Sequence, residues 1–164
     1  CIAGKTSADP SFELPDVRRD GTPDGMLRVC KQVANETNPN VWIHAAAVLD
    51  YYAEAEDGKK PSGVDNWSLD LTPGPKHIAE LASLVGGATR IGFKLESDVT
   101  PATLIERASA QIERYGVNAV IANLMEEMND PDKIRARIVH ADGTVDEASD
   151  DRELCEAINR LIKG

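Results

Sequence analysis

The sequence predicts an α/β fold with three layers, in which helices cover both faces of a mostly parallel sheet. Three short apolar runs, at residues 41–47, 90–96 and 118–123, have the composition of buried strands. Between them lie segments with apolar residues every three or four positions, which is typical of amphipathic helices. This alternation of helix and strand is the pattern of a layered, largely parallel sheet.

The first part of the chain predicts a strand end, a polar connection and a helix. Residues 1–7 read as the end of a strand that runs into a loop, and residues 11–23 are polar, with at most a short strand near Val17. Thr22 and the proline after it have the order of a helix N-cap and first turn. The apolar spacing then predicts a helix to about Thr37, where an Asn-Pro-Asn sequence ends it.

The next stretch holds the first candidate site. Residues 41–47 predict a strand, and three alanines at its end would let another molecule approach the backbone closely. Asp50 adds a carboxylate just past that end. Because ligands of open α/β sheets lie beyond the carboxyl ends of the strands, Ala45 to Asp50 is a candidate binding site. The alternative is an alanine-rich turn with a solvated aspartate.

The remaining elements follow from local pattern. Residues 54–63 are charged and predict a mobile loop; residues 66–72 alternate between apolar and polar and predict a half-buried strand. Further helices are predicted over 78–85, ending at a Gly-Gly pair, over 100–115 after a Thr-Pro cap, and over 150–163. An Asp-Gly turn predicts a hairpin between 135–140 and 144–145.

Length and charge restrict the function. The 164 residues suit one domain, residues 1–164, with a real core, and the net charge of −10 argues against a general nucleic-acid or membrane-surface binder. Neither a signal peptide nor a span-length apolar run is visible, and three widely spaced cysteines match no disulfide or metal framework. We therefore expect a cytoplasmic protein with reduced cysteines and no structural metal. Cys30 and Cys155 are expected in the core, on apolar helix faces.

The sequence contains part of one phosphate-binding motif and lacks another. Gly4 to Ser7 resembles the end of a Walker A loop, but a proline break follows where that motif requires a helix. No G-x-G-x-x-G sequence occurs, which argues against a nicotinamide or flavin oxidoreductase. If the three central strands are parallel, however, Asp50, Phe93 and Asn123 all reach the same edge of the sheet. Together with the Lys59-Lys60 pair of the loop, they would suit a nucleotide and an anionic substrate.

At these residues the chain resembles the phosphopantothenoylcysteine synthetases, also called phosphopantothenate–cysteine ligases. The resemblance is carried, in register over nearly the whole chain, by His-Ala-Ala-Ala-Val-Leu-Asp-Tyr from His44, Gly-Lys-Lys-Pro-Ser-Gly from Gly58, Leu-Asp-Leu-Thr-Pro from Leu69, Ile-Gly-Phe-Lys-Leu-Glu-Ser-Asp from Ile91 and Val-Ile-Ala-Asn from Val120. The family contains the C-terminal domain of the bifunctional coenzyme A biosynthesis flavoprotein. The resemblance implies a Rossmann-like domain that forms homodimers. It also implies a small β element at the dimer contact, which includes residues 66–72.

The resemblance implies a two-step ligation in coenzyme A biosynthesis. The carboxylate of 4'-phosphopantothenate reacts with CTP or ATP to give an acyl-nucleotide and pyrophosphate, and the amine of cysteine then displaces the nucleoside monophosphate. Mg²⁺ is expected with the triphosphate. The alternative function is a non-catalytic binding or assembly subunit that keeps the fold.

The resemblance also assigns roles. Phe93 would line the nucleobase pocket and Asn123 would bind base or ribose, unless they are a core residue and a strand cap. Lys59 would be the catalytic loop lysine that stabilises developing charge, with Lys60 as the alternative for that position, and both would contact the nucleotide. The pair would otherwise be solvated. Ala46, Ala47 and Asp50 would contact the phosphopantothenate arm bound to the partner subunit.

One part of the family pattern has no counterpart. The family begins with a strand, a Gly-Gly-Thr turn and an Asn-x-Ser-Ser-Gly segment, and residues 1–7 align best with its second strand. Since the first strand would be central, its loss would expose unpaired backbone. We therefore expect a domain that is incomplete at its N-terminus, inactive as such a fragment, and completed by the same or another chain.

Overall fold

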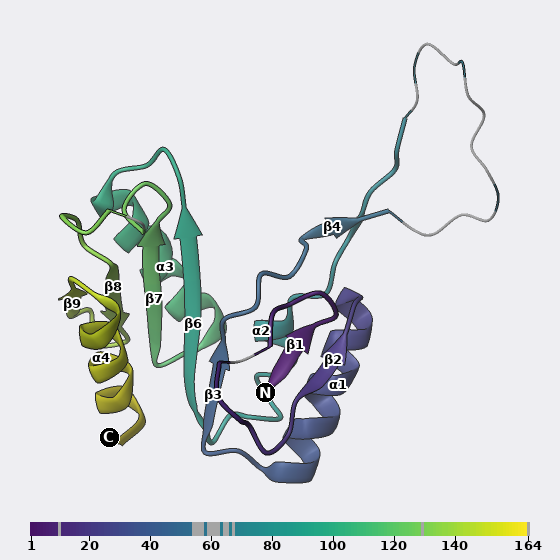
Figure 1. The fold of residues 1–164 in the computed structure, drawn as a ribbon, viewed down its shortest axis with the longest axis horizontal. Helices are drawn as coiled ribbons and strands as arrows, with labels where there is room; N and C mark the ends of the chain where they lie inside the picture. The colour runs from purple at the N-terminus through teal and green to yellow at the C-terminus, as the bar shows by residue number, and fades with distance from the viewer. Residues whose placement is uncertain are drawn as a thin grey trace.

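A five-stranded mixed sheet forms the centre of the protein (Figure 1). The structure, a computed structural model, describes residues 1–9, 11–53, 58, 63, 66, 68–128 and 130–163. The strand order is β3–β6–β7–β8–β9, and these strands are Val41–His44, Thr89–Glu96, Ala119–Leu124, Ala136–His140 and Val145–Ala148. The pairs β3–β6 and β6–β7 are parallel, whereas β7–β8 and β8–β9 are antiparallel. The predicted α/β, Rossmann-like class is confirmed.

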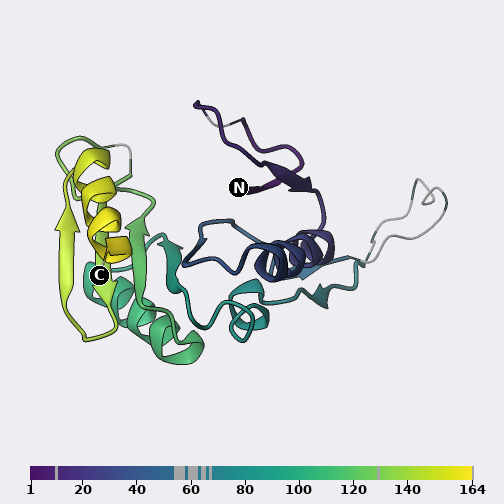
Figure 2. The ribbon, with the colours of Figure 1, turned by 90° about the horizontal axis from the view of Figure 1, so that it is seen from below.

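Four helices, α1 (Pro23–Thr37), α2 (His77–Glu80), α3 (Pro101–Tyr115) and α4 (Asp151–Lys163), complete the layers. Figure 2 shows α3 and α4 on opposite faces of the sheet. Alternate residues of β7 therefore enter two cores: Ile121 packs on the α4 side and Val120 on the α3 side. Within the described part of the chain, no helix is both long and apolar enough to cross a membrane.

The helix caps follow the sequence signals. Thr22 accepts a hydrogen bond from the Gly25 amide and Thr100 accepts one from the Thr103 amide, each with proline at the start of the helix. Asn38 and Gly116 end α1 and α3 in the left-handed conformation. Local sequence is enough to place these ends, because a cap satisfies the orphan backbone groups of its own helix.

A second sheet consists of β1 (Ile2–Gly4) and β2 (Arg18–Asp20), which pair in parallel. The short strand expected near Val17 thus exists one residue further along. These strands lie over α1, and Ile2 packs against the cluster that α1 forms with Leu81 and Val85. Neither β1 nor β2 pairs with β3, so β1 and β3 each keep one unpaired edge within the described chain.

A two-stranded antiparallel ribbon of β4 (Tyr51–Tyr52) and β5 (Thr72–Pro73) projects from the body (Figure 1). The predicted strand over 66–72 is wrong: residues 68–71 are exposed and have no strand geometry, and Trp67 lies outside the described residues. Leu69 and Leu71 remain about half exposed. Alternation produces a strand only where one face meets a core, and these residues meet none in the single chain.

The base of this ribbon depends on a glycine. The Gly74 amide donates to the Asp50 carbonyl at 2.7 Å, and a Cβ at Gly74 would lie 2.5 Å from the Leu49 carbonyl oxygen. We expect Gly74→Ala to open this contact and to raise the hydrogen-exchange rate of the residue 74 amide at least about tenfold. Gly87→Ala, where a Cβ meets nothing within 4 Å, is the control. Equal protection in both variants would contradict this.

Two further expectations need correction. The helix predicted over 78–85 is only the four-residue α2, after which a series of turns carries Leu81 and Val85 into the core. The Leu84 amide bonds to Leu81, three residues back, so the segment tightens instead of continuing as an α-helix. Cys30 is buried as expected, and burial raises the pKa of its thiol to about 11. Cys155 is exposed, because it lies on the outer side of α4.

Candidate functional site

A cavity of about 890 Å³ opens beside β3, next to the carboxyl-terminal half of β6. Its wall combines β1, β3 and the carboxyl-terminal half of β6 with the inner sides of α1 and α3 and the segment that follows β3. The parallel register, with Ile43 beside Ile91 and His44 beside Gly92, places the end of β3 beside the middle of β6. The segment that follows β3 therefore runs past the carboxyl-terminal half of β6. This is the place where open α/β sheets bind ligands.

Three of the predicted site residues line this cavity: Ala46, Asp50 and Phe93. The Asp50 carboxylate forms an ion pair with Lys76, just before α2. Ala47 is exposed and lies outside the wall. Lys59 and Lys60, together with nearly all of the loop predicted over 54–63, fall outside the described residues.

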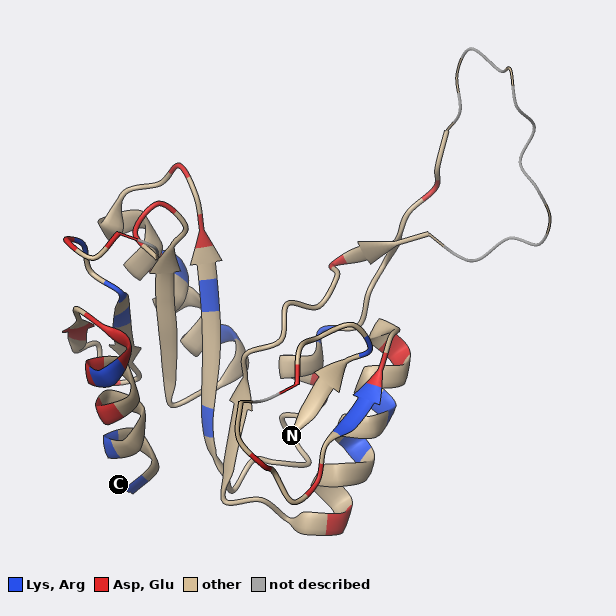
Figure 3. Ribbon diagram, viewed as in Figure 1, with Lys and Arg blue, Asp and Glu red and all other residues tan. Residues whose placement is uncertain are grey.

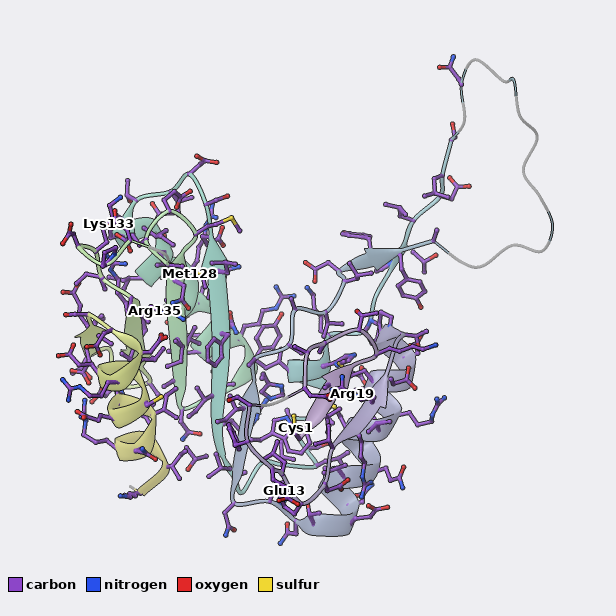
Figure 4. All side chains as sticks on the ribbon, viewed as in Figure 1. Cys1, Glu13, Arg19, Met128, Lys133 and Arg135 are labelled. Atoms are coloured by element: carbon purple, nitrogen blue, oxygen red, sulfur yellow. The ribbon has the colours of Figure 1, made fainter. Side chains whose placement is uncertain are left out.

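Asn123 lies near Phe93 but outside the cavity wall. Since Leu95 pairs with Asn123 and Phe93 with Ile121, the two residues are on the same face of adjacent strands, two positions apart. The Asn123 side chain is buried, and its amide donates to the Arg135 carbonyl at 2.8 Å. Figure 4 shows Arg135 just ahead of β8. This bond is the strand-cap arrangement that the sequence left open as an alternative.

Cationic side chains on the wall were not predicted. Lys94 and Arg107 flank the Glu96 carboxylate, at 2.9 and 2.6 Å, and these contacts hold the pKa of Glu96 below its usual value. Figure 3 shows basic positions (blue) along β6 and an acidic position (red) at its carboxyl-terminal end. Among described residues, the wall carries four cations, namely Lys76, Lys94, Arg107 and Arg114, and one carboxylate, that of Asp50. In a chain of net charge −10, this wall favours an anionic ligand.

Sequence signals for these cations were weak. Lys94 lies within the Phe-Lys-Leu-Glu motif, but strand alternation places it on the face opposite Phe93. Arg107 is eleven residues beyond Glu96, on a different element, and only the packing of α3 against β6 brings the two together. A lysine or arginine on an amphipathic helix is normally solvated, so its position alone indicates no site.

His44, the last residue of β3, lines the cavity. Burial, with smaller contributions from the nearby Arg90 and His77, lowers the pKa of its imidazole to about 4. Burial also lowers the pKa of His77, whose Nε2 lies 2.9 Å from the Pro23 carbonyl oxygen. Both rings are therefore neutral near pH 7.

These two histidines predict a loss of stability in acid. An unfolded histidine binds a proton near pH 6.5, whereas folded His44 does so only near pH 4. The unfolded state therefore binds more protons between these values, and the free energy of unfolding falls as the pH drops from about 6.5 to 4. We expect His44→Phe to reduce the slope of Tm against pH in this window. Some slope should remain, because His77 also has a lowered pKa. An unchanged slope would contradict the buried neutral state.

The described residues do not form a metal site. No cluster of three or more histidine, cysteine, aspartate or glutamate side chains with metal-binding geometry occurs in that part of the chain.

The chain is similar in sequence to a described protein family and to curated proteins. Residues 2–163 match the family described as the C-terminal domain of the DNA/pantothenate metabolism flavoprotein. The chain is 31% identical over 120 residues to the coenzyme A biosynthesis bifunctional protein CoaBC of Thermococcus kodakarensis, covering 73% of this chain and 30% of that protein. It is 32% identical over 106 residues to the phosphopantothenate–cysteine ligase of Homo sapiens, covering 62% and 33%.

A solved structure shows the same fold. The chain resembles the DNA/pantothenate metabolism flavoprotein from Streptococcus pneumoniae with a TM-score of 0.80 and 21% identity, over 97% of this chain and 79% of that one. At this identity the likeness concerns the fold. The chain spans about a third of the length of the two curated relatives above.

Proposed function

The chain belongs to the family of the DNA/pantothenate metabolism flavoprotein C-terminal domain, and from that premise we propose that it joins 4'-phosphopantothenate to cysteine in coenzyme A biosynthesis. The names of the curated relatives support this role. One structural observation carries the proposal: the cavity beside β3 and β6 combines Ala46, Asp50 and Phe93 with a cationic wall.

The proposed chemistry has two balanced steps. A carboxylate oxygen of 4'-phosphopantothenate bonds to the α-phosphorus of CTP or ATP, and pyrophosphate leaves. The cysteine amine then bonds to the acyl carbon, losing a proton, and the nucleoside monophosphate leaves. Both steps handle anions, and preorganised cations such as Lys94 and Arg107 stabilise negative charge at little reorganisation cost.

The remaining roles follow from position. Phe93 offers an aromatic face to the nucleobase, while the small Ala46 and the carboxylate of Asp50 receive the phosphopantothenate arm. The Asn123 amide gives one N–H to the Arg135 carbonyl. Its oxygen and its second N–H are the groups that would contact the nucleotide. We keep Lys59 as the proposed catalytic lysine of the loop, with Lys60 as the alternative. Mg²⁺ enters this proposal only with the triphosphate, as its usual companion.

We further propose that the active form is a homodimer and that an additional strand completes the domain. The exposed Leu49, Tyr51, Leu69 and Leu71 lie at the ribbon and its base, where a second copy would cover them.

The unpaired edges of β1 and β3 both bound the cavity, and a strand from the same or another chain would pair with them. Hydrogen exchange tests the additional strand. The β3 amides should exchange more slowly in a protein that contains the additional strand than in residues 1–164 alone.

A pyrophosphate-release assay tests the ligase. The protein as its gene encodes it is given cysteine and 4'-phosphopantothenate with either CTP or ATP. We expect release that requires 4'-phosphopantothenate and occurs with at least one nucleotide, and mass spectrometry should find 4'-phosphopantothenoylcysteine. No turnover with either nucleotide, together with calorimetric binding of 4'-phosphopantothenate, would replace the ligase with a non-catalytic binding subunit.

A further inference from the structure

Two buried side-chain nitrogens beside the cavity have no hydrogen-bond partner among the described residues: His44 Nε2 and Arg90 Nε. Arg90 is only 4% exposed. Its terminal nitrogens are committed elsewhere, Nη1 to the Tyr115 carbonyl at 2.9 Å and Nη2 to the Ile78 carbonyl at 2.6 Å. The Nε–H group is therefore left with an unmet donor in the protein interior, which is uncommon in folded proteins.

The two nitrogens come from neighbouring positions. Trp42 pairs with Arg90 and His44 with Gly92, so His44 and Arg90 are diagonal neighbours on the same face of β3 and β6. Gln111 of α3 covers the same place: its Nε2 would lie 2.7 Å from a Cβ built on Gly92. His44 and Gln111 also line the cavity. The side chains of His44, Arg90 and Gln111, all able to form hydrogen bonds, thus lie on one face of the two strands around Gly92.

We propose that His44 and Arg90 form a subsite for a single hydroxyl-type oxygen, which accepts from Arg90 Nε–H and donates to His44 Nε2. An O–H oxygen is the group that can accept and donate at once. A phosphate or carboxylate oxygen only accepts, and it would leave an unprotonated imidazole nitrogen unsatisfied. The oxygen is that of an ordered water in the free protein or of an alcohol group on a ligand that fills the cavity.

The proposal fixes the tautomer of the ring. Arg90 carries a positive charge, and its proximity favours the neutral imidazole whose nearby nitrogen bears a lone pair instead of a proton. His44 therefore carries its proton on Nδ1, with Nε2 as the acceptor. A buried water in such a place is part of the structure, because it satisfies groups that would otherwise be costly to bury.

Crystallography and NMR of the full chain test the subsite. We expect an ordered oxygen within ~3.2 Å of both His44 Nε2 and Arg90 Nε in the ligand-free crystal. Imidazole ¹⁵N–¹H correlation spectra should place the His44 proton on Nδ1. A direct bond between the two side chains, a proton on Nε2, or no oxygen where other buried waters are visible would each overturn the proposal.

Two variants and one soak sharpen the result. His44→Gln keeps a polar atom near the position of Nε2 and should keep the oxygen, whereas His44→Phe should lose it. An oxygen that stays at the same position in His44→Phe would overturn the assignment. In crystals soaked with 4'-phosphopantothenate, water or the substrate hydroxyl at this point supports the subsite, and a phosphate or carboxylate oxygen there contradicts it. None of these readouts depends on ligase turnover.

Discussion

Replacing Arg90 by methionine is expected to lower the free energy of unfolding by about 3 kcal/mol or more. The buried guanidinium ties three elements together, because it bonds from β6 to the carbonyls of Tyr115 at the end of α3 and Ile78 of α2. Methionine has similar length but no donor, so two partly buried carbonyls would lose charged partners worth about 1.5–3 kcal/mol each.

Thermal or urea unfolding measures this effect. For a chain of this size, 3 kcal/mol corresponds to a fall in Tm of roughly 6–12 °C. Arg152→Met is the matched control, since Arg152 is exposed and makes only an i,i+4 pair with Glu156. Such exposed pairs contribute about 0.3–0.5 kcal/mol. If Arg90→Met unfolds within 2 °C of the unchanged protein, water or neighbouring donors must satisfy those carbonyls.

The second large effect concerns activity. Asp50→Asn is expected to lower kcat/KM of the proposed ligation about 100-fold, because the amide keeps the shape of the side chain but removes the charge that receives donors of the substrate. A hydrogen bond to a charged group contributes about 1.5–3 kcal/mol, and each 1.36 kcal/mol is a factor of ten in rate.

Stability should not change in this variant. The Asp50–Lys76 pair is exposed on both sides, with side-chain exposures of 64% and 52%, and pairs of this kind contribute little. Asp132→Asn, in the loop after β7, removes an exposed carboxylate away from the cavity and should leave both kcat/KM and Tm unchanged. If the unchanged enzyme is active and Asp50→Asn retains full activity, Asp50 has no role in substrate binding.

The candidate site was predictable only in part. Ala46 and Asp50 lie at and just past the end of a predicted strand, and Phe93 lies within another. Such strands are recognisable because they are short apolar runs. Lys94 and Arg107 were missed, since their convergence on Glu96 depends on how α3 lies against β6. Asn123 shows the opposite case, in which a residue at the expected edge uses its amide to bond Arg135 within the fold.

Patterns that depend on their surroundings were the ones that failed. The alternation over 66–72 is the same in a half-buried strand and in an exposed segment, and only the presence of a core on one side separates the two. The apolar spacing over 78–85 buries Leu81 and Val85 as a helix would, yet tight turns place them equally well. Cys155 sits on a helix whose apolar stripe is narrower than its spacing suggested.

The sequence by itself determined the layered α/β fold, the ends of α1 and α3, and the strands of the central sheet. Caps, periodicity and apolar runs act within a few residues of one another, so their physics is complete in a short segment. The tertiary structure decided the cationic wall, the buried Arg90 and the unpartnered nitrogen of His44. These arise from contacts between residues far apart in the chain, and their energies exist only once the helices have packed against the sheet.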